Sequence, residues 1–258
     1  VLLMHMDNAL TDSSVNDLTV TNNNSMTFNS SNKKFGTHSL YCEGDTAAKY
    51  LSTGDLSSGL TNAMPTTGDF TIDYWAAYIS RGASERHWGI GNNGAPSGGS
   101  NGAIAFSIQG AGPTNAIDTW GVSQSGAHNT NEAFAINATW QAFRHWAIQR
   151  TGTYTYVWID GVVCANNAYP TNWNGENLMV NDKNIFIGVR SSGSTEFFDG
   201  YIDEFRVSNT SRYTGGSNFT PPTSAYSAGD INATGTLIQA TNTVTGDRTT
   251  VGSTMLYK

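Results

Sequence analysis

Residues 143–163 read FRHWAIQRTGTYTYVWIDGVV, and this stretch decides the fold that we expect for the chain. Two runs of alternating apolar and polar residues flank a turn at Thr151-Gly152-Thr153. Alternation with a period of two, carried by aromatic and β-branched residues, is the pattern of a β-strand. The glycine between the two runs makes them a hairpin, and Asp160-Gly161 predicts a second tight turn at its far end.

The second run of this hairpin carries bulky side chains on both faces. Thr155, Val157 and Ile159 point to one side of the strand. Tyr156 and Trp158 point to the other side. We therefore expect this strand to lie in the middle of a sheet that is covered on both faces.

Short strands separated by turn residues are expected along most of the chain. They are Val1–Met6, Ser39–Cys42, Phe70–Ile79, His87–Gly91, Ala103–Gln109, Ile117–Val122, Ile185–Val189 and Tyr201–Val207. Tyr50-Leu51 is expected to be an edge strand, whereas Asn22–Asn24 reads as a turn and Ser123–Glu132 as a polar loop. Apolar residues recur at two positions rather than at three or four, so the pattern predicts an all-β sandwich without amphipathic helices.

The composition supports this class and limits the partners. Of the 258 residues, 38% are apolar and only 13% are charged, and there are 28 glycines. The formal net charge of −7 and the lack of a basic cluster argue against nucleic acid as a partner. No apolar run approaches the roughly 20 residues of a membrane span, so we expect no membrane insertion. Cys42 and Cys164 fit either a disulfide or two buried free thiols, and free thiols are the simpler interpretation.

The sequence divides into a sandwich domain at 1–223 and a C-terminal extension at 224–258. Thr220-Pro221-Pro222-Thr223 ends the strand-rich region. Residues 226–258 are rich in Thr and Gly and include two short strand-like runs, which would be marginal alone. We expect this arm to pair with another part of the protein or with another chain, and we expect the sequence to belong to a longer polypeptide.

Five segments in order resemble the concanavalin A-like lectin/glucanase superfamily, in particular its laminin G-like branch. They are LLMHMD at 2–7, FGTHSLYCEG at 35–44, FTIDYW at 70–75, the hairpin from His145 to Gly161, and FDGYIDEFRVS at 198–208. The resemblance implies a two-sheet antiparallel jelly roll whose first and last strands are neighbours. It also implies a setting in bacterial surface proteins or phage structural proteins, and hence an extracellular or virion-surface location.

Catalysis is not expected, although glycosidases share this fold. Retaining glycoside hydrolysis needs two carboxylates about 5 Å apart, and the glucanases of the family carry Glu, Asp and Glu at alternate positions of one strand. The chain has no such triplet. Asp203 and Glu204 are adjacent, so on a regular strand they would face opposite ways. We read both as structural.

One structural calcium ion is a further expectation. Some laminin G-like domains hold calcium near their first and last strands, and calcium prefers carboxylate and carbonyl oxygens. Asp7 follows the first strand and Asp203 lies in the last, so the two could converge. The alternative is that both carboxylates cap turns.

Exposed tryptophans next to polar loops are the candidates for binding a sugar. A sugar ring needs an aromatic face for its C–H surface and amides or charges for its hydroxyl groups. Trp173 is the first choice because it lies in the polar segment PTNWNGEN, and Trp88 and Trp120 follow. Arg81 and Arg190 could pair with acidic sugars. The alternative for each tryptophan is ordinary packing in the core.

The resulting hypothesis is a non-enzymatic, lectin-like module of a larger structural or adhesion protein. Its partners would be a cell-surface glycan and other subunits of a virion or surface assembly, and a homo-oligomer, with a trimer favoured, would be formed through the arm. Two alternatives stay open. The first is a purely structural decoration protein, and the second is a glycan-active hydrolase or its accessory module.

Overall fold

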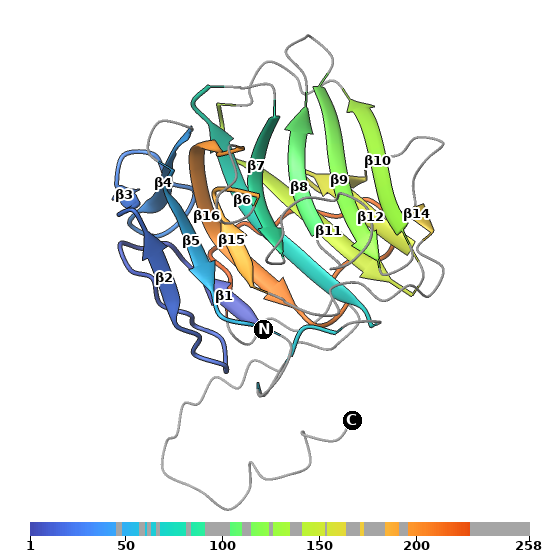
Figure 1. The fold of residues 1–258 in the computed structure, drawn as a ribbon, viewed down its shortest axis with the longest axis horizontal. Helices are drawn as coiled ribbons and strands as arrows, with labels where there is room; N and C mark the ends of the chain where they lie inside the picture. Colours follow the sequence, from blue (N-terminus) through green and yellow to red (C-terminus); the bar gives the residue numbers. More distant parts are fainter. Residues whose placement is uncertain are drawn as a thin grey trace, which may run out of the picture.

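The computed structural model consists of two antiparallel β-sheets packed face to face (Figure 1). It describes residues 1–44, 48–56, 60, 63–65, 68–80, 84–90, 104–109, 115–123, 126–134, 141–152, 154–163, 171–172, 184–190 and 196–227. For residues 84, 104–109, 115–123, 126–134 and 171–172 the description is confined to the backbone. The all-β sandwich predicted from the alternation is confirmed.

The nine-stranded sheet runs in the order β13-β12-β11-β6-β16-β4-β3, with β1 also beside β16 and β14 beside β12. Its strands are β1 (Leu2–Met4), β3 (Thr27–Asn29), β4 (Ser39–Glu43), β6 (Phe70–Tyr78), β11 (Arg144–Thr151), β12 (Tyr154–Ile159), β13 (Val162–Val163), β14 (Thr171–Asn172) and β16 (Asp199–Ser208). The first strand pairs with the last, Leu2 opposite Val207 and Met4 opposite Phe205, as the resemblance implied.

The seven-stranded sheet runs in the order β10-β9-β8-β7-β15-β5-β2. Its strands are β2 (Val20–Asn23), β5 (Tyr50–Thr53), β7 (Ser84–Ile90), β8 (Ile104–Gln109), β9 (Asn115–Ser123), β10 (Gly126–Phe134) and β15 (Ile185–Ile187). Figure 1 shows β7, β8, β9 and β10 side by side. The described part of the chain contains no helix long and apolar enough to cross a membrane.

The core lies between the two sheets and follows the predicted alternation. The hairpin at 143–163 forms β11 and β12, and Val157 and Ile159 of β12 belong to the main core cluster. Trp158 faces the other way and is also fully buried. The backbone turns through Gly152 (φ +60°) and through Asp160-Gly161 (φ +50° and +73°), conformations that favour glycine.

A buried histidine joins the two sheets inside the core. His87 of β7 is bonded through its ring nitrogens to the hydroxyl groups of Tyr74 and Tyr78 of β6. Burial lowers the pKa of His87 to about 3, so the ring is neutral at pH 7. With one partner on each nitrogen, this polar group costs little to bury.

Three strand assignments from the sequence were wrong. Val20–Asn23 forms the edge strand β2, where Asn22–Asn24 had been expected to turn. Gly126–Phe134 forms the opposite edge strand β10, in place of the expected polar loop. Tyr50–Thr53 lies inside the sheet between β15 and β2, not at its edge. Edge strands rich in Asn carry little apolar alternation, so the pattern does not reveal them.

Candidate functional site

One register row crosses the whole seven-stranded sheet on the face turned away from the core. The directly paired positions are, from β2 to β10, Thr21, Ser52, Phe186, Gly89, Ala105, Trp120 and Asn129. Residues directly opposite one another in an antiparallel sheet share a face. The row therefore belongs to one face from edge to edge.

Burial of the neighbouring residues identifies this face as the outer one. Ile185 and Ile187 of β15 and Trp88 and Ile90 of β7 all belong to the core cluster between the sheets. Phe186 and Gly89 alternate with them and thus face outward. Trp120, which shares their row, occupies an outward register position.

The remaining outward positions of β7–β10 are mostly polar. The next row pairs Arg86, Ser107, Asp118 and Asn131, and Gln109 lies two residues beyond Ser107 on β8. We call this set of outward register positions the Trp120 face; it comprises Arg86, Gly89, Ala105, Ser107, Gln109, Asp118, Trp120, Asn129 and Asn131. Arg86 and Gly89 are themselves buried. Amides, a hydroxyl group and small residues around one tryptophan are the chemistry that a carbohydrate site requires.

Two arginines at the border of the Trp120 face share one carboxylate. Glu196 Oε2 lies 3.0 Å from Arg86 Nε and 2.9 Å from Arg190 Nη1. The main chain of Arg190 crosses directly over Gly89, since a Cβ atom at Gly89 would lie 1.9 Å from the Arg190 carbonyl oxygen. Arg190 thus lies at this surface, already engaged in an ion pair.

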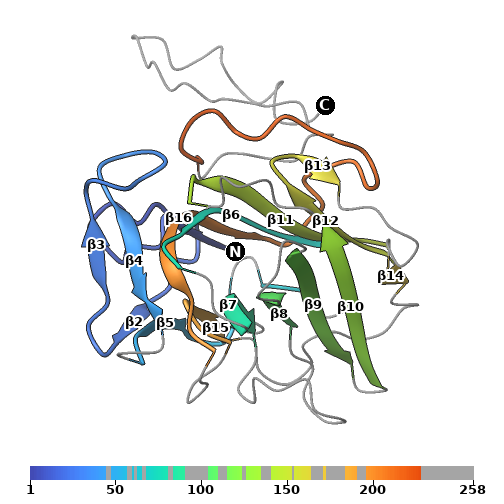
Figure 2. The ribbon, with the colours of Figure 1, turned by 90° about the horizontal axis from the view of Figure 1, so that it is seen from above.

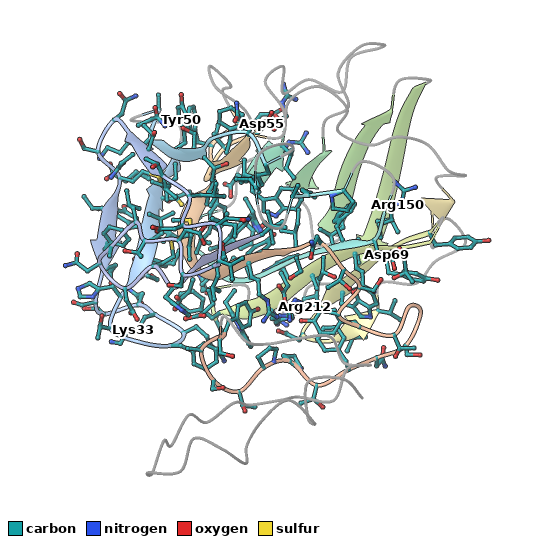
Figure 3. All side chains as sticks on the ribbon, turned by 90° about the horizontal axis from the view of Figure 1, so that it is seen from below. Lys33, Tyr50, Asp55, Asp69, Arg150 and Arg212 are labelled. Atoms are coloured by element: carbon teal, nitrogen blue, oxygen red, sulfur yellow. The ribbon has the colours of Figure 1, made fainter. Side chains whose placement is uncertain are left out.

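Beside the ion pair, a small apolar cluster continues the outer face towards β5. Phe186, Val189 and Phe197 are buried together, and the half-buried Tyr50 packs on them with its ring 5.9 Å from that of Phe186. In Figure 3, Tyr50 lies on the opposite side of the sandwich from Arg212. This cluster anchors the chain on both sides of residue 196 to the sheet.

The tryptophans predicted from the sequence have different positions. Trp120 lies on the outward row described above. The prediction that Trp88 binds a sugar was wrong, because its side chain is 0% exposed and packs in the core near Phe205. The first choice, Trp173, lies outside the described residues, as does Arg81. Arg86, Asn129 and Asn131 were missed, and the one available signal was the Asn-x-Asn alternation in β10.

The outer face of the other sheet is covered by the protein itself. Residues 209–227, which we call the C-terminal strap, run across β11 and β12 on the side away from β7–β10 (Figure 2). Gln149 Oε1 accepts hydrogen bonds from the main-chain nitrogens of Arg212 and Tyr213, at 2.7 and 2.9 Å. Trp158 Nε1 donates to the carbonyl of Ser217 at 2.8 Å. This contact explains why Trp158 is buried although it points away from the core.

A buried network lies beneath the strap. Arg206 grips Asp73 with two hydrogen bonds of 2.9 and 2.5 Å, and the hydroxyl of Tyr213 donates to the same carboxylate at 2.6 Å. Burial alone would raise the pKa of Asp73, but the adjacent Arg206 charge brings it down to about 2. Asp73 is therefore ionised and fully paired, which is a structural role.

His145 belongs to this network as well. Its Nε2 lies 2.9 Å from the hydroxyl of Tyr226, and the ring of Tyr226 stacks on the guanidinium of Arg206 at 3.7 Å. Burial lowers the pKa of His145 to about 4, so it is neutral at pH 7. The group holds the end of the strap on the sheet.

A β-bulge changes the expected arrangement of Asp203 and Glu204. The pairing of β16 with β6 shifts between Asp203 and Arg206, and Glu204 has φ +52°. Asp203 accepts the main-chain N–H groups of Lys34 and Phe35, while Glu204 accepts that of Tyr226 and pairs with His5. Both carboxylates thus face the outside of the nine-stranded sheet, contrary to the opposite orientations expected of a regular strand.

The apolar residues of β16 contained a signal for this bulge. Ile202, Phe205 and Val207 all belong to the core, and the spacing of three between the first two breaks the period of two. Burial raises the pKa of Asp203 to about 7. Since Asp203 and Glu204 are both fully buried, the pair offers no open cleft for a substrate.

The predicted calcium ligands, Asp7 and Asp203, both hold the turn at residues 34–38. Asp7 Oδ1 accepts hydrogen bonds from the main-chain N–H groups of Thr37 and His38. Gly36 (φ +56°) lies against the same carboxylate, and a Cβ there would be 2.3 Å from its oxygens. Within the described residues no cluster of three or more metal-ligating side chains occurs. These N–H donors favour the turn-capping role, and calcium binding stays a prediction.

Comparison with known proteins agrees with this architecture. The Laminin_G_3 family, described as concanavalin A-like lectin/glucanases superfamily, matches residues 45–213. The chain therefore belongs to the concanavalin A-like lectin/glucanase superfamily. No curated protein matches the chain in sequence.

Two solved structures share the fold at low sequence identity. One is domain 4 of AbnA, a GH43 extracellular arabinanase from Geobacillus stearothermophilus, in complex with arabinotriose (TM-score 0.56, 16% identity, covering 80% of this chain and 90% of that one). The other is the enzymatically active domain of tailspike protein 2 of bacteriophage CBA120 (TM-score 0.52, 12% identity, covering 74% of this chain and 28% of that one). At these identities the likeness is one of fold.

Proposed function

We propose that this domain is a non-enzymatic carbohydrate-binding module and that the Trp120 face is its binding surface. The observation that carries the proposal is the register row that pairs Trp120 with Asn129 at outward positions of the sheet, with Asn131 and Ser107 in the next row. An aromatic ring stacks on the C–H face of a sugar, and amides bond its hydroxyl groups in fixed directions.

The distribution of acids supports binding without hydrolysis. Among the outward register positions of β7–β10, Asp118 is the only acid. Hydrolysis through a pair of carboxylates requires a second acid within about 5–10 Å. On the nine-stranded sheet, Asp203 and Glu204 are buried. Glu43 and Asp199 are paired across β4 and β16, and their carboxylates are held by Lys49 and Ser80 respectively.

The setting of the module is part of the same proposal. A domain of this fold has been solved with arabinotriose, and the fold also occurs in a phage tailspike; both support a role in holding a protein at a glycan surface. We place the module on the outside of a cell or virion, as part of a larger adhesion or structural protein.

Replacing Trp120 with alanine tests the proposal. The stacking contribution of one aromatic ring is about 0.5–1.5 kcal/mol beyond area burial, so we expect Kd to rise by about two- to ten-fold or more. Binding is measured by retardation in gels containing polysaccharides and by titration calorimetry. Tyr154→Ala is the matched control, because Tyr154 is 39% exposed on the nine-stranded sheet. Equal losses in both variants, or in neither, would contradict the assignment of the face. Trp173→Ala tests the first choice from the sequence in the same assay.

A further inference from the structure

A register row with two tyrosines crosses the outer face of the nine-stranded sheet. Tyr41 of β4 is paired directly with Tyr201 of β16, and Tyr201 is paired with Ala77 of β6. The residues that alternate with them along the strands belong to the core cluster between the sheets: Leu40, Cys42, Ala76, Tyr78 and Ile202. The row itself therefore faces away from the core.

The aromatic rings at this row form a continuous strip. The ring centroids of Tyr41 and Tyr201 lie 5.5 Å apart with their planes inclined by 31°, and the ring of Phe143, directly before β11, lies 6.4 Å from that of Tyr201. Strand β6 lies between β16 and β11, and its residue in this row is the small Ala77, which allows the rings on its two sides to approach. All three aromatic residues are half-buried. We call Tyr41, Tyr201 and Phe143 the aromatic strip.

Polar groups with fixed directions border the aromatic strip. Two residues further along the strands, Glu43 of β4 is paired with Asp199 of β16. Glu43 exposes 26% of its side chain, and its Oε1 lies 2.6 Å from Lys49 Nζ. Asn32 Nδ2 donates a hydrogen bond to the hydroxyl of Tyr201 at 3.2 Å. The rings are thus accompanied by carboxylates and an amide that the fold holds in place.

This combination suits a sugar better than a protein partner. The cores of protein–protein interfaces are depleted in Glu, Asp and Lys, whereas a sugar needs an aromatic face for its C–H surface and polar groups for its hydroxyl groups. A carboxylate has about four acceptor sites, so one that is held by a protein side chain can also accept a sugar hydroxyl. Because the rings follow one another at 5.5 and 6.4 Å, the strip extends beyond a single stacking position.

We infer that the aromatic strip is a second carbohydrate-binding surface and that it takes an extended polysaccharide whose sugar rings present apolar C–H faces. It lies on the opposite side of the sandwich from the Trp120 face, so the inference goes beyond the proposed function and stands on different residues. A module with both surfaces holds two glycan chains at once, which links them and raises the avidity for a surface that carries many copies.

The number of oligosaccharides bound per chain tests the inference. Linear arabinan, xylan and β-glucan are screened by retardation in gels, and the hexasaccharide of each polymer that retards the protein is then titrated by calorimetry. We expect wild type to bind two hexasaccharides per chain. Each stacking ring contributes about two- to ten-fold in Kd, so Tyr41→Ala/Tyr201→Ala should weaken the strip by about four- to hundred-fold and reduce the stoichiometry to one.

Two further variants serve as controls. Tyr154→Ala removes an exposed tyrosine of the same sheet outside the strip, and we expect its stoichiometry to stay at two. Tyr201→Phe keeps the ring and removes only the hydroxyl that bonds Asn32, so its Kd should stay within about two-fold of wild type. Melting temperatures confirm that each variant is folded. If the double variant does not fold, Tyr41→Ala alone, with an expected two- to ten-fold rise in Kd at the strip, takes its place.

The possible outcomes separate the two surfaces. A stoichiometry of one that Trp120→Ala weakens and the double variant does not would overturn the inference and leave the proposed function in place. A single site that only the double variant loses would support the strip and overturn the assignment of the Trp120 face. Binding of none of the probes would count against both. A double variant that binds glycans like wild type but has a lower mass in light scattering would overturn the inference and identify the strip as an interface between copies.

Discussion

The β-bulge in β16 determines the orientation of two acidic side chains. The bulge at Glu204 turns two neighbouring acids to the same side of β16. Asp203 then receives two main-chain N–H groups from the 34–38 turn, and Glu204 receives one from the strap. A strained position in the last strand thereby connects this strand to two segments distant in sequence.

Asp203 gives the domain a pH dependence that can be isolated. Its pKa is raised from 3.8 to about 7 in the folded protein, so the folded state holds a proton that the unfolded chain releases from about pH 4 upward. Asp203 therefore lowers the free energy of unfolding as the pH rises through this window. Each unit of pKa corresponds to about 1.36 kcal/mol, which makes a decrease of a few kcal/mol an upper limit.

The measurement is the difference in unfolding free energy between wild type and Asp203→Asn, from urea titrations between about pH 4 and about pH 8. Contributions of the buried histidines largely cancel in this difference. We expect the advantage of the Asn variant to grow with pH, and a difference that stays flat would show that Asp203 is ionised throughout.

At the level of elements, the strap behaves as a covering layer of the nine-stranded sheet. Its main chain donates hydrogen bonds to Gln149 Oε1 and accepts one from Trp158 Nε1. Near its end, Tyr226 is 3% exposed beside Leu3 and Trp75. Gly215 lies against the ring of Tyr156, where a Cβ atom would be 2.6 Å away. Any other residue at this position would displace the ring of Tyr156, so the close approach of the loop favours glycine.

Tyr226 is the residue through which the strap can be tested. Tyr226→Ala removes a buried aromatic ring, its stacking on Arg206 and its bond to His145, and we expect a loss of about 3–5 kcal/mol. Tyr226→Phe removes only the hydroxyl and should cost about 0.5–1.5 kcal/mol. Denaturant titration measures both. If the alanine variant were as stable as the phenylalanine variant, the strap would contribute nothing at its end.

The sequence predicted the elements that alternate and missed those that do not. Residues 70–78 and 144–159 were identified because apolar and aromatic residues recur every second position and pack in the core. Strands β2 and β10 were missed because edge strands need little apolar surface. The site followed the same division: Trp120 was named from the sequence, whereas Arg86, Asn129 and Asn131 required the register that only the pairing of four strands provides.

For the whole molecule, assembly remains the main prediction. Residues 226–258 are strand-prone by sequence. A strand-prone segment can pair with the exposed edge of a sheet in another chain. We expect the full chain to form a homo-oligomer, with a trimer favoured. Because Tyr226 packs on its own sandwich, the informative truncation ends the chain at Ser227.

Light scattering of the full chain and of the 1–227 fragment at matched concentrations tests this prediction. The fragment should be monomeric and should keep the melting behaviour of the sandwich. A monomeric full chain, or a fragment that assembles equally well, would show that the C-terminal arm does not mediate assembly.

The pairing of the first strand with the last has a consequence for how the domain can be joined to other proteins. The amino group of Val1 lies 2.9 Å from the carbonyl oxygen of Val207, and Leu3 packs beside Tyr226. Both ends of the folded unit thus emerge close together on the nine-stranded sheet, on the opposite side of the sandwich from Trp120. Domains whose ends meet in this way tolerate insertion into a loop of a host protein. If this domain were inserted at such a loop, its nine-stranded sheet would face the host protein and its seven-stranded sheet would face away from it. The two attachment points would fix this orientation without a linker.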